Sequence, residues 1–343
     1  MPHALTSPLT RRGLLAAGGA VGLGVALAAC GGGDTKDGGA KQGGGAGGDW
    51  SFKDDRGVVA KADRVPRNIV AFTGTAAALH DYGVEVKGVF GPTKAKDGKP
   101  DVQAGDLDID KVEILGNTYG EFNVEKYAAL NPELLVSAQW LKGELWYVPE
   151  QSKDKILGLA PSVGLWAAET TLPKAIRRHA ELAESLGADL GAPKVADAKA
   201  RFEKAAERLR QAAKSRPEIK VLIGSASQDL FYVSLPKMSA DTRYFQDLGV
   251  RFIQPEKVNA QGFFEELSWE NVGKYDADII MTDNRSSALQ PAALSSKPTW
   301  RKLPAVEADQ VIPRVTEPVF SYAKCAPILD DLAAAIENAK KAA

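Results

Sequence analysis

The sequence predicts an α/β protein of two lobes, each built on a Rossmann-like parallel sheet, joined by one long bridging helix. Short apolar runs alternate with amphipathic stretches along most of the chain. This strand–helix–strand order favours parallel strands with right-handed crossovers. The alternation stops once, where two helical stretches follow each other, and then restarts. A chain of 343 residues also usually divides into two domains instead of one larger core.

The first half carries the pattern of one such sheet. Its apolar runs predict strands at 67–72, 86–90, 133–138 and 162–166. Its helical stretches are short. They are 76–82, ended by Gly83 as a C-cap, and 124–130, ended by Asn131 and Pro132.

Two longer helices are expected in the middle of the chain. The first, 172–186, ends at Gly187 and has one apolar face, formed by Ile176, His179, Leu182, Ala183 and Leu186. The second, 196–215, is highly charged and is closed by Pro217. The first of the two is the expected bridge between the lobes.

The second half repeats the α/β rhythm. Its expected strands are 220–225, 230–234, 251–253, 277–282 and 310–314. Its expected helical segments are 241–248, 269–273, 299–303 and 326–342.

The N-terminus predicts export and anchoring. Arg11 and Arg12 precede an uncharged run, 13–29, which is short for a membrane span and fits a secretory signal of the twin-arginine type. The following Leu-Ala-Ala-Cys resembles a bacterial lipobox, which implies cleavage before Cys30 and lipid attachment to its sulfur. The glycine-dominated segment 31–48 then serves as a flexible tether. The alternative is an ordinary signal peptide with an incidental cysteine.

These features predict a domain order and a location. The expected segments are a signal peptide at 1–29, a lipidated cysteine and tether at 30–49, an N-terminal lobe at 50–169, a bridging helix at 170–190 and a C-terminal lobe at 191–343. The protein is expected at the cell membrane, lipid-anchored on the extracytoplasmic face, with its folded part in the adjacent water.

Composition excludes several classes of function. The formal net charge of −1 carries no basic excess, so nucleic-acid binding is not expected. Two cysteines make no disulfide framework, and three scattered histidines make no histidine-rich metal site. We therefore expect no direct metal ligand and no cofactor.

The residues that follow the predicted strands suggest a ligand site, because ligands of open parallel sheets bind beyond the carboxyl ends of the strands. Aromatic and amide side chains gather there: Tyr119, Gln139, Trp140, Trp146, Tyr147, Trp166, Phe231, Tyr232 and Tyr322. Arg285 and Arg314 add fixed positive charge. Such rings suit a cleft for a sizeable, partly apolar ligand. The alternative is that the rings cover the core and the arginines form surface ion pairs.

Three phrases of sequence carry a family resemblance. They are Arg-Asn-Ile-Val-Ala at 67–71, Asn-Val-Glu-Lys at 123–126 leading to Leu-Asn-Pro-Glu-Leu-Leu-Val at 130–136, and Trp-Arg-Lys-Leu-Pro-Ala-Val at 300–306. Together with the lipobox and the two lobes, they resemble the substrate-binding lipoproteins of ABC importers that bind ferric siderophores, haem and cobalamin. The resemblance implies a monomer with a rigid helix between its lobes and a largely pre-formed cleft, and it implies no enzymatic activity.

The resemblance also implies two docking residues. In that family each lobe presents a surface glutamate to arginines of the membrane permease, and the matching positions here are Glu125 and Glu270. Two distant ion pairs fix orientation and speed encounter even though each adds little affinity. The alternative is that both carboxylates only favour the helix starts where they lie.

The expected ligand is a ferric siderophore, with the hydroxamate type favoured. A strongly anionic catecholate would call for more positive charge than two candidate arginines. Haem or cobalamin is the alternative in the same fold, with Tyr119 or Tyr147 as an axial ligand to haem iron. A lipid-anchored hydrolase is a weaker alternative. The run Gly-Ser-Ala-Ser at 224–227 lacks the final glycine of a nucleophile elbow, and no histidine follows the bridging helix.

Overall fold

The computed structural model describes residues 48–342. The predicted signal peptide, Cys30 and nearly all of the tether lie outside the described residues. No helix within 48–342 is long and apolar enough to cross a membrane.

The first lobe is built on a five-stranded sheet in which every pairing is parallel. Its order is β5-β4-β3-β6-β7, with β3 at Ile69–Phe72, β4 at Gly88–Phe90, β5 at Glu113–Ile114, β6 at Leu134–Gln139 and β7 at Ser162–Trp166. The helical segments of this lobe are α1 at Thr73–Asp81, η1 at Val102–Ala104, α2 at Val124–Ala129, η2 at Glu150–Ser152 and α3 at Lys153–Leu157. The four strands expected from the apolar runs are present within three residues of their predicted ends.

An antiparallel hairpin precedes this sheet and was not expected from the sequence. It consists of β1 at Trp50–Lys53 and β2 at Val59–Ala62. Trp50 and Phe52 point inward on alternate positions of β1 and are buried. Their rings belong to the first-lobe core.

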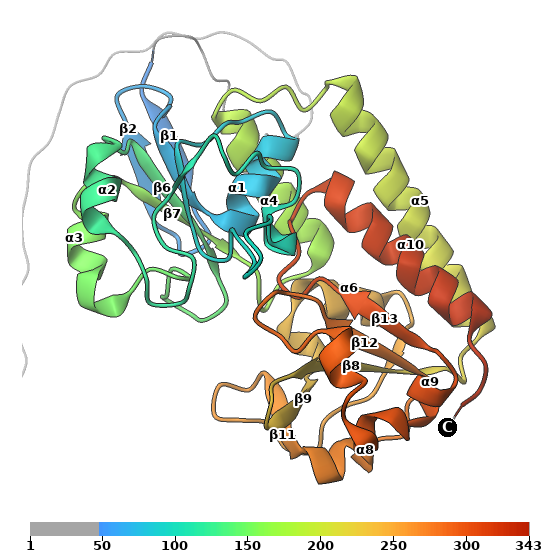
Figure 1. The fold of residues 1–343 in the computed structure, drawn as a ribbon. Helices are drawn as coiled ribbons and strands as arrows, with labels where there is room; N and C mark the ends of the chain where they lie inside the picture. The colour runs from blue at the N-terminus through green and yellow to red at the C-terminus, as the bar shows by residue number, and fades with distance from the viewer. Residues whose placement is uncertain (1–47, 343) are drawn as a thin grey trace, which may run out of the picture. The chain divides into compact units, whose positions relative to one another are not determined.

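Two consecutive helices connect the sheets. α4, Leu172–Ser185, packs against α1 and β7 of the first lobe and also meets α6 of the second. α5, Pro193–Ser215, is longer and runs beside the last helix, α10, Tyr322–Asn338 (Figure 1). The domain boundaries expected at 50–169, 170–190 and 191–343 stay predictions.

The second lobe contains a six-stranded mixed sheet. Its main path is β11-β9-β8-β12-β13, and β10 pairs with β8. The strands are β8 at Lys220–Ala226, β9 at Leu230–Ser234, β10 at Arg251–Phe252, β11 at Phe264–Ser268, β12 at Ile279–Asp283 and β13 at Val311–Arg314. The helical segments are η3 at Pro236–Met238, α6 at Ala240–Asp247, η4 at Trp269–Lys274, α7 at Pro291–Leu294, α8 at Pro298–Arg301 and α9 at Pro304–Glu307.

This sheet departs from the expected parallel pairing at one edge. β9 pairs antiparallel with β8 and β11 pairs antiparallel with β9, while the other pairings are parallel. For the β8–β9 pair the reason is connection length, because only residues 227–229 separate the two strands, and a parallel crossover needs a dozen or more. The α/β class with parallel sheets is confirmed, and the β9–β11 edge is an antiparallel addition to it.

One buried apolar cluster continues through both lobes. It includes Val70 and Leu135 of the first sheet, Ile176 of α4, and Val221 and Met281 of the second sheet. Separate clusters cover the other face of each sheet. The two lobes therefore share part of their core.

Candidate ligand-binding cleft

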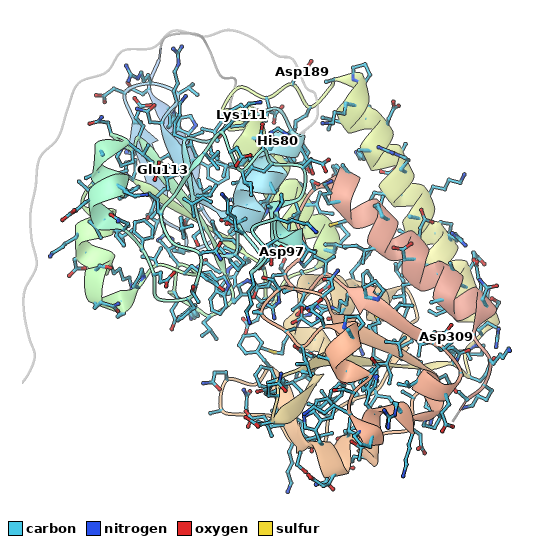
Figure 2. The ribbon with its side chains drawn as sticks, viewed as in Figure 1. His80, Asp97, Lys111, Glu113, Asp189 and Asp309 are labelled. Atoms are coloured by element: carbon cyan, nitrogen blue, oxygen red, sulfur yellow. The ribbon has the colours of Figure 1, made fainter. Side chains whose placement is uncertain are left out.

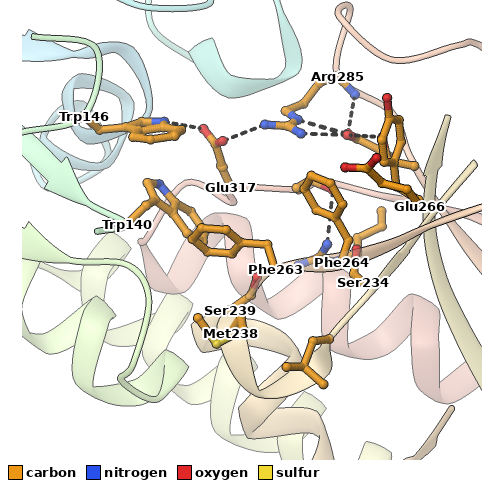
Figure 3. A pocket seen from close by; sticks show the side chains of 16 residues that line it. Trp140, Trp146, Ser234, Met238, Ser239, Phe263, Phe264, Glu266, Arg285 and Glu317 are labelled. Atoms are coloured by element: carbon orange, nitrogen blue, oxygen red, sulfur yellow. Dashed lines mark hydrogen bonds and ion pairs between the residues drawn. The ribbon is translucent and has the colours of Figure 1, made fainter. Parts of the chain in front are cut away.

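A cavity of about 460 Å³ is lined by residues of both sheet regions (Figure 3). Trp140 and Trp146, which follow β6, form the first-lobe side. The second-lobe side contains Tyr232, Phe263 and Phe264 together with polar residues. This volume lies in the range of small-molecule sites, and the mixture of rings and a few polar groups is typical of them.

The rings are arranged as two walls. Trp140 and Trp146 have centroids 6.4 Å apart on one side, and Tyr232 and Phe264 have centroids 5.0 Å apart on the other. Tyr232 lies on β9 and Phe264 on β11, where antiparallel pairing brings their side chains to one face of the sheet. Trp140 is 6% exposed, and its indole Nε1 has no hydrogen-bond partner within the described residues.

Arg285 lies at the cavity between two carboxylates. Its Nη2 is 2.8 Å from Asp283 Oδ2, and its Nη1 is 2.6 Å from Glu317 Oε1. Burial by itself would raise the pKa of Asp283, but the guanidinium and its hydrogen bonds lower that pKa below the ordinary value. Burial would lower the pKa of Arg285, and the charges of Glu317 and Asp283 raise it instead. Asp283 and Arg285 are therefore both ionised at neutral pH.

Arg314 is the second cavity arginine, and its charge is also paired. It is 2% exposed and donates to both carboxylate oxygens of Asp241 over 2.9 to 3.1 Å. Its Nη1 donates to the Thr316 hydroxyl over 3.2 Å. Both predicted arginines thus reach the cavity, but each is held by carboxylates of the chain itself.

Glu317 connects the two sides of the cleft. Its Oε2 accepts hydrogen bonds from Gln103 Nε2 over 2.9 Å and from Trp146 Nε1 over 3.3 Å. Both donors belong to the first lobe, while Arg285, which holds Oε1, belongs to the second. Glu317 also has a φ of 60°, a left-handed conformation that strains a side-chain-bearing residue.

Some predicted residues lie beside the cavity without lining it. Tyr119 and Tyr147 pack against Trp146 with centroids 5.4 and 5.9 Å from its ring, and Tyr119 is 61% exposed. Gln139 is buried beneath this group and donates to the Glu144 carbonyl. These residues support the tryptophan wall.

Three other predicted aromatics lie elsewhere. Phe231 is buried between Trp269 and Trp300 in the second-lobe core, because neighbouring residues of a strand face opposite sides and Tyr232 faces the cavity. Tyr322 packs on Phe202 of α5. Trp166 ends β7, is half-buried and is not among the cavity residues.

Several cavity residues were not foreseen. They are Ser225, Ser234, Leu235, Met238, Ser239, Phe263, Phe264, Glu266, Asp283, Thr316 and Glu317. Asp283 could have been found, because it ends β12 two residues before Arg285. β11 was not predicted as a strand, so nothing in the sequence pointed Phe264 and Glu266 toward the site.

The cavity has a serine and a carboxylate in contact, but no histidine is among the described residues that line it. Ser225 Oγ donates to Asp283 Oδ2 over 3.0 Å. Neither of the two histidines within 48–342 lines the cavity. His80 lies on α1 (Figure 2), and its Nδ1 is 3.2 Å from Glu85. His179 is buried in α4. Within the same residues, no group of three or more His, Cys, Asp or Glu side chains could hold a metal ion.

The two predicted docking glutamates are exposed and lie outside the cavity. Glu125 is in the first turn of α2, and Glu270 is in the first turn of η4. Neither side chain forms an ion pair with another of the described residues. Both positions are thus accessible from solvent.

A family model described as periplasmic binding protein matches residues 70–313. DesE, a ferric-siderophore receptor protein from Streptomyces coelicolor, is 61% identical, with a TM-score of 0.83 over 86% of this chain and 100% of that chain. A curated relative, the Fe(3+)-citrate-binding protein YfmC of Bacillus subtilis, is 23% identical over 75% of this chain and 76% of its own.

More distant solved structures share the fold alone. The petrobactin-binding protein YclQ of Bacillus subtilis is 18% identical, with a TM-score of 0.61 over 84% of this chain and 99% of that chain. The family consists of solute-binding proteins and not of enzymes. The residues matched by the family model include strands of both sheets and most residues of the cleft. The resemblance seen in the sequence is confirmed: this chain belongs to the periplasmic binding protein family.

Proposed function

We propose that this protein binds a ferric siderophore, of the hydroxamate type, in the aromatic-walled cleft and delivers it to an ABC permease. The likeness to DesE over most of the chain supports a ferric siderophore as the ligand. The observation that carries the hydroxamate type is the pairing of both cleft arginines with carboxylates of the chain.

This pairing matters because siderophore classes differ in charge. Ferric catecholates carry several negative charges, and ferric trihydroxamate cores are neutral. To bind an anionic chelate, Arg285 or Arg314 would have to give up a carboxylate partner, which leaves a charge uncompensated. A neutral core needs only ring contacts and hydrogen-bond donors. Trp140 and Trp146 line the cavity and supply the ring contacts.

The proposal is tested by titrating the mature protein with a ferrioxamine-type complex and with a ferric catecholate while following tryptophan fluorescence. The hydroxamate complex should quench fluorescence at low concentration, and the catecholate should not. Trp146→Ala should weaken hydroxamate binding by about tenfold or more, as expected for a central aromatic contact. Trp166→Phe, outside the cavity, is the control and should bind normally. Quenching by the catecholate alone would refute the hydroxamate assignment.

Haem remains the competing ligand within this fold, and the cleft gives it less support. Tyr147 is one candidate axial ligand, and burial raises the pKa of its phenol. To bind iron as a phenolate, Tyr147 would have to lose its proton, and a raised pKa disfavours that loss. Adding hemin and recording the Soret band tests this alternative, and a shifted band that Tyr147→Phe abolishes would favour haem.

We also propose the anchoring and docking roles for Cys30, Glu125 and Glu270. Cys30→Ala should release the protein from the membrane fraction. Replacing both glutamates with alanine should reduce uptake of the iron complex by cells while leaving its affinity for the purified protein unchanged. A double variant that transports normally would show that these carboxylates serve only their helix starts.

A further inference from the structure

The charges around the cleft are unbalanced in favour of acid. The cavity is lined by the carboxylates of Glu266, Asp283 and Glu317, and by the guanidinium groups of Arg285 and Arg314. The charge of Arg314 is neutralised by Asp241, which does not line the cavity, through a bidentate ion pair. Asp283 and Glu317 share Arg285 between them. The site therefore has more carboxylates than cations.

Glu266 differs from the other acids because its side chain is exposed and has no hydrogen bond or ion pair with another residue of 48–342. It lies on β11 directly opposite Tyr232 of β9, two residues after Phe264. Residues two apart share a face of a strand, so Glu266 stands on the cavity face with those two rings (Figure 3).

The neighbouring cation does not cancel this charge. An outer hollow is lined by residues of 266–274, among them Glu266, Glu270 and Lys274. The Nζ of Lys274 is 2.6 Å from Glu265 and 2.9 Å from Glu256. Glu265 faces the opposite side of β11, where it also accepts from the Tyr275 hydroxyl. Glu266 thus stays an unpaired negative charge at the rim, in contact with both the cavity and the solvent-facing hollow.

We propose that Glu266 is a specificity-determining residue that accepts a cationic ammonium group carried by the chelator. Ferric chelates with such a group are bound more tightly than neutral ones, and neutral ones more tightly than anionic ones. The rings of Tyr232 and Phe264 beside the carboxylate add to the preference, because aromatic faces attract cations. The inference rests on the proposed binding of a ferric hydroxamate and names the charge of its preferred form.

The test uses three ligands that differ only at one end. Ferrioxamine B carries a free terminal amine, its N-acetyl derivative is neutral there, and its N-succinyl derivative carries a carboxylate. Affinities are measured by tryptophan fluorescence at low and at high salt. The native protein should bind the cationic ligand most tightly, then the neutral one and then the anionic one. These differences in affinity should shrink at high salt.

The variant Glu266→Gln should weaken binding of the cationic ligand by about threefold to fivefold, as expected for a partly exposed ion pair, and leave the neutral ligand within about twofold. Glu266→Lys should reverse the preference. Glu270→Gln is the matched control, because this exposed carboxylate borders the same outer hollow but not the cavity. It should leave the ranking unchanged.

The outcomes separate the inference from the function on which it rests. If none of the three ligands binds, the proposed hydroxamate function fails, and this inference fails with it. If all three bind with equal affinity, or if Glu266→Gln weakens them equally, the function stands and the role of Glu266 is overturned. Thermal unfolding of each variant checks that the fold is intact.

Discussion

At the residue scale, Glu317 is held in place from several directions. It is 8% exposed, has a positive φ, and is hydrogen-bonded to Gln103, Trp146 and Arg285. Non-glycine residues in this backbone region persist only where their surroundings hold them, and they gather at ligand sites. Here the surroundings are donors from both sides of the cleft, so Glu317 contributes to the alignment of the two walls.

We expect Glu317→Gln to destabilise the protein by about 1–2 kcal/mol, because the amide keeps the shape but removes one of the two charges that hold Arg285. Urea unfolding of the variant measures this loss. Glu307→Gln in α9 serves as a control, because Glu307 is exposed and should change the free energy of unfolding by less than about 0.5 kcal/mol. Equal stability of wild type and Glu317→Gln would show that the Arg285–Asp283 pair suffices.

His179 makes the stability depend on pH. It is buried in α4, its Nδ1 is 2.9 Å from the Ala175 carbonyl oxygen, and its ring lies 5.3 Å from that of Phe320. Burial lowers its pKa from 6.5 to about 4, although the hydrogen bond opposes the shift. The folded state therefore keeps the imidazole neutral over a range in which the unfolded chain protonates it.

The direction in which stability changes with pH follows from proton binding. Between about pH 4 and 6.5 the unfolded state binds more protons at this site, so stability rises with pH across that window and is lost on acidification. The contribution reaches about 3 kcal/mol at most. Unfolding free energies of wild type and His179→Gln at several pH values measure it. The difference between them should change across the window, and parallel pH profiles would contradict the prediction.

At the element scale, the β8–β9 hairpin explains a glycine that the sequence left unassigned. Gly224 lies on β8 beneath the ring of Phe231, and a Cβ built at this position would approach that ring to 2.3 Å. The ring covers the glycine because Phe231 follows a tight connection and folds back over the preceding strand. Gly224 therefore serves packing, which agrees with the lack of an elbow motif.

Gly224→Ala should cost about 1–3 kcal/mol, as overpacking of a core does. Gly191→Ala is the control, because its Cβ would meet only the Asp189 carboxylate oxygen, at 3.2 Å, and that flexible group can move. Chemical denaturation of the two variants provides the comparison. A neutral Gly224→Ala would mean that the Phe231 ring shifts freely.

At the scale of the whole molecule, the shared core limits how the two sheets can move. Buried residues of α4, α6 and α10 form one apolar cluster with both sheets, and the Ala240 amide donates to the Ala167 carbonyl where α6 meets the end of the first lobe. Packed cores resist gradual deformation because interiors are as dense as organic crystals. A wide opening between the lobes would expose part of this cluster to water.

We therefore expect the cleft to be largely pre-formed. Crystal structures of the protein with and without a ferric hydroxamate should differ by about 1 Å or less in backbone position around the cleft. Side-chain changes at Arg285 and the tryptophans are compatible with this expectation. A rigid-body closure of several ångströms would contradict it.

The sequence by itself determined the fold class, most strands and helices, and the aromatic rings and two arginines of the candidate site. These properties depend on local patterns, such as apolar runs and the residues that end strands. Trp140, Trp146, Tyr232, Arg285 and Arg314 were found in this way, and all five line the cavity.

Tertiary structure alone decided which charges cancel and which remain. Arg314 is paired with Asp241, 73 residues away, and Arg285 with Glu317, 32 residues away. Composition shows that these groups exist but not which of them meet, because a partner is chosen by the packing of distant elements. The same reason hid Glu266, whose place in the cleft depends on a strand pairing at the edge of the second sheet.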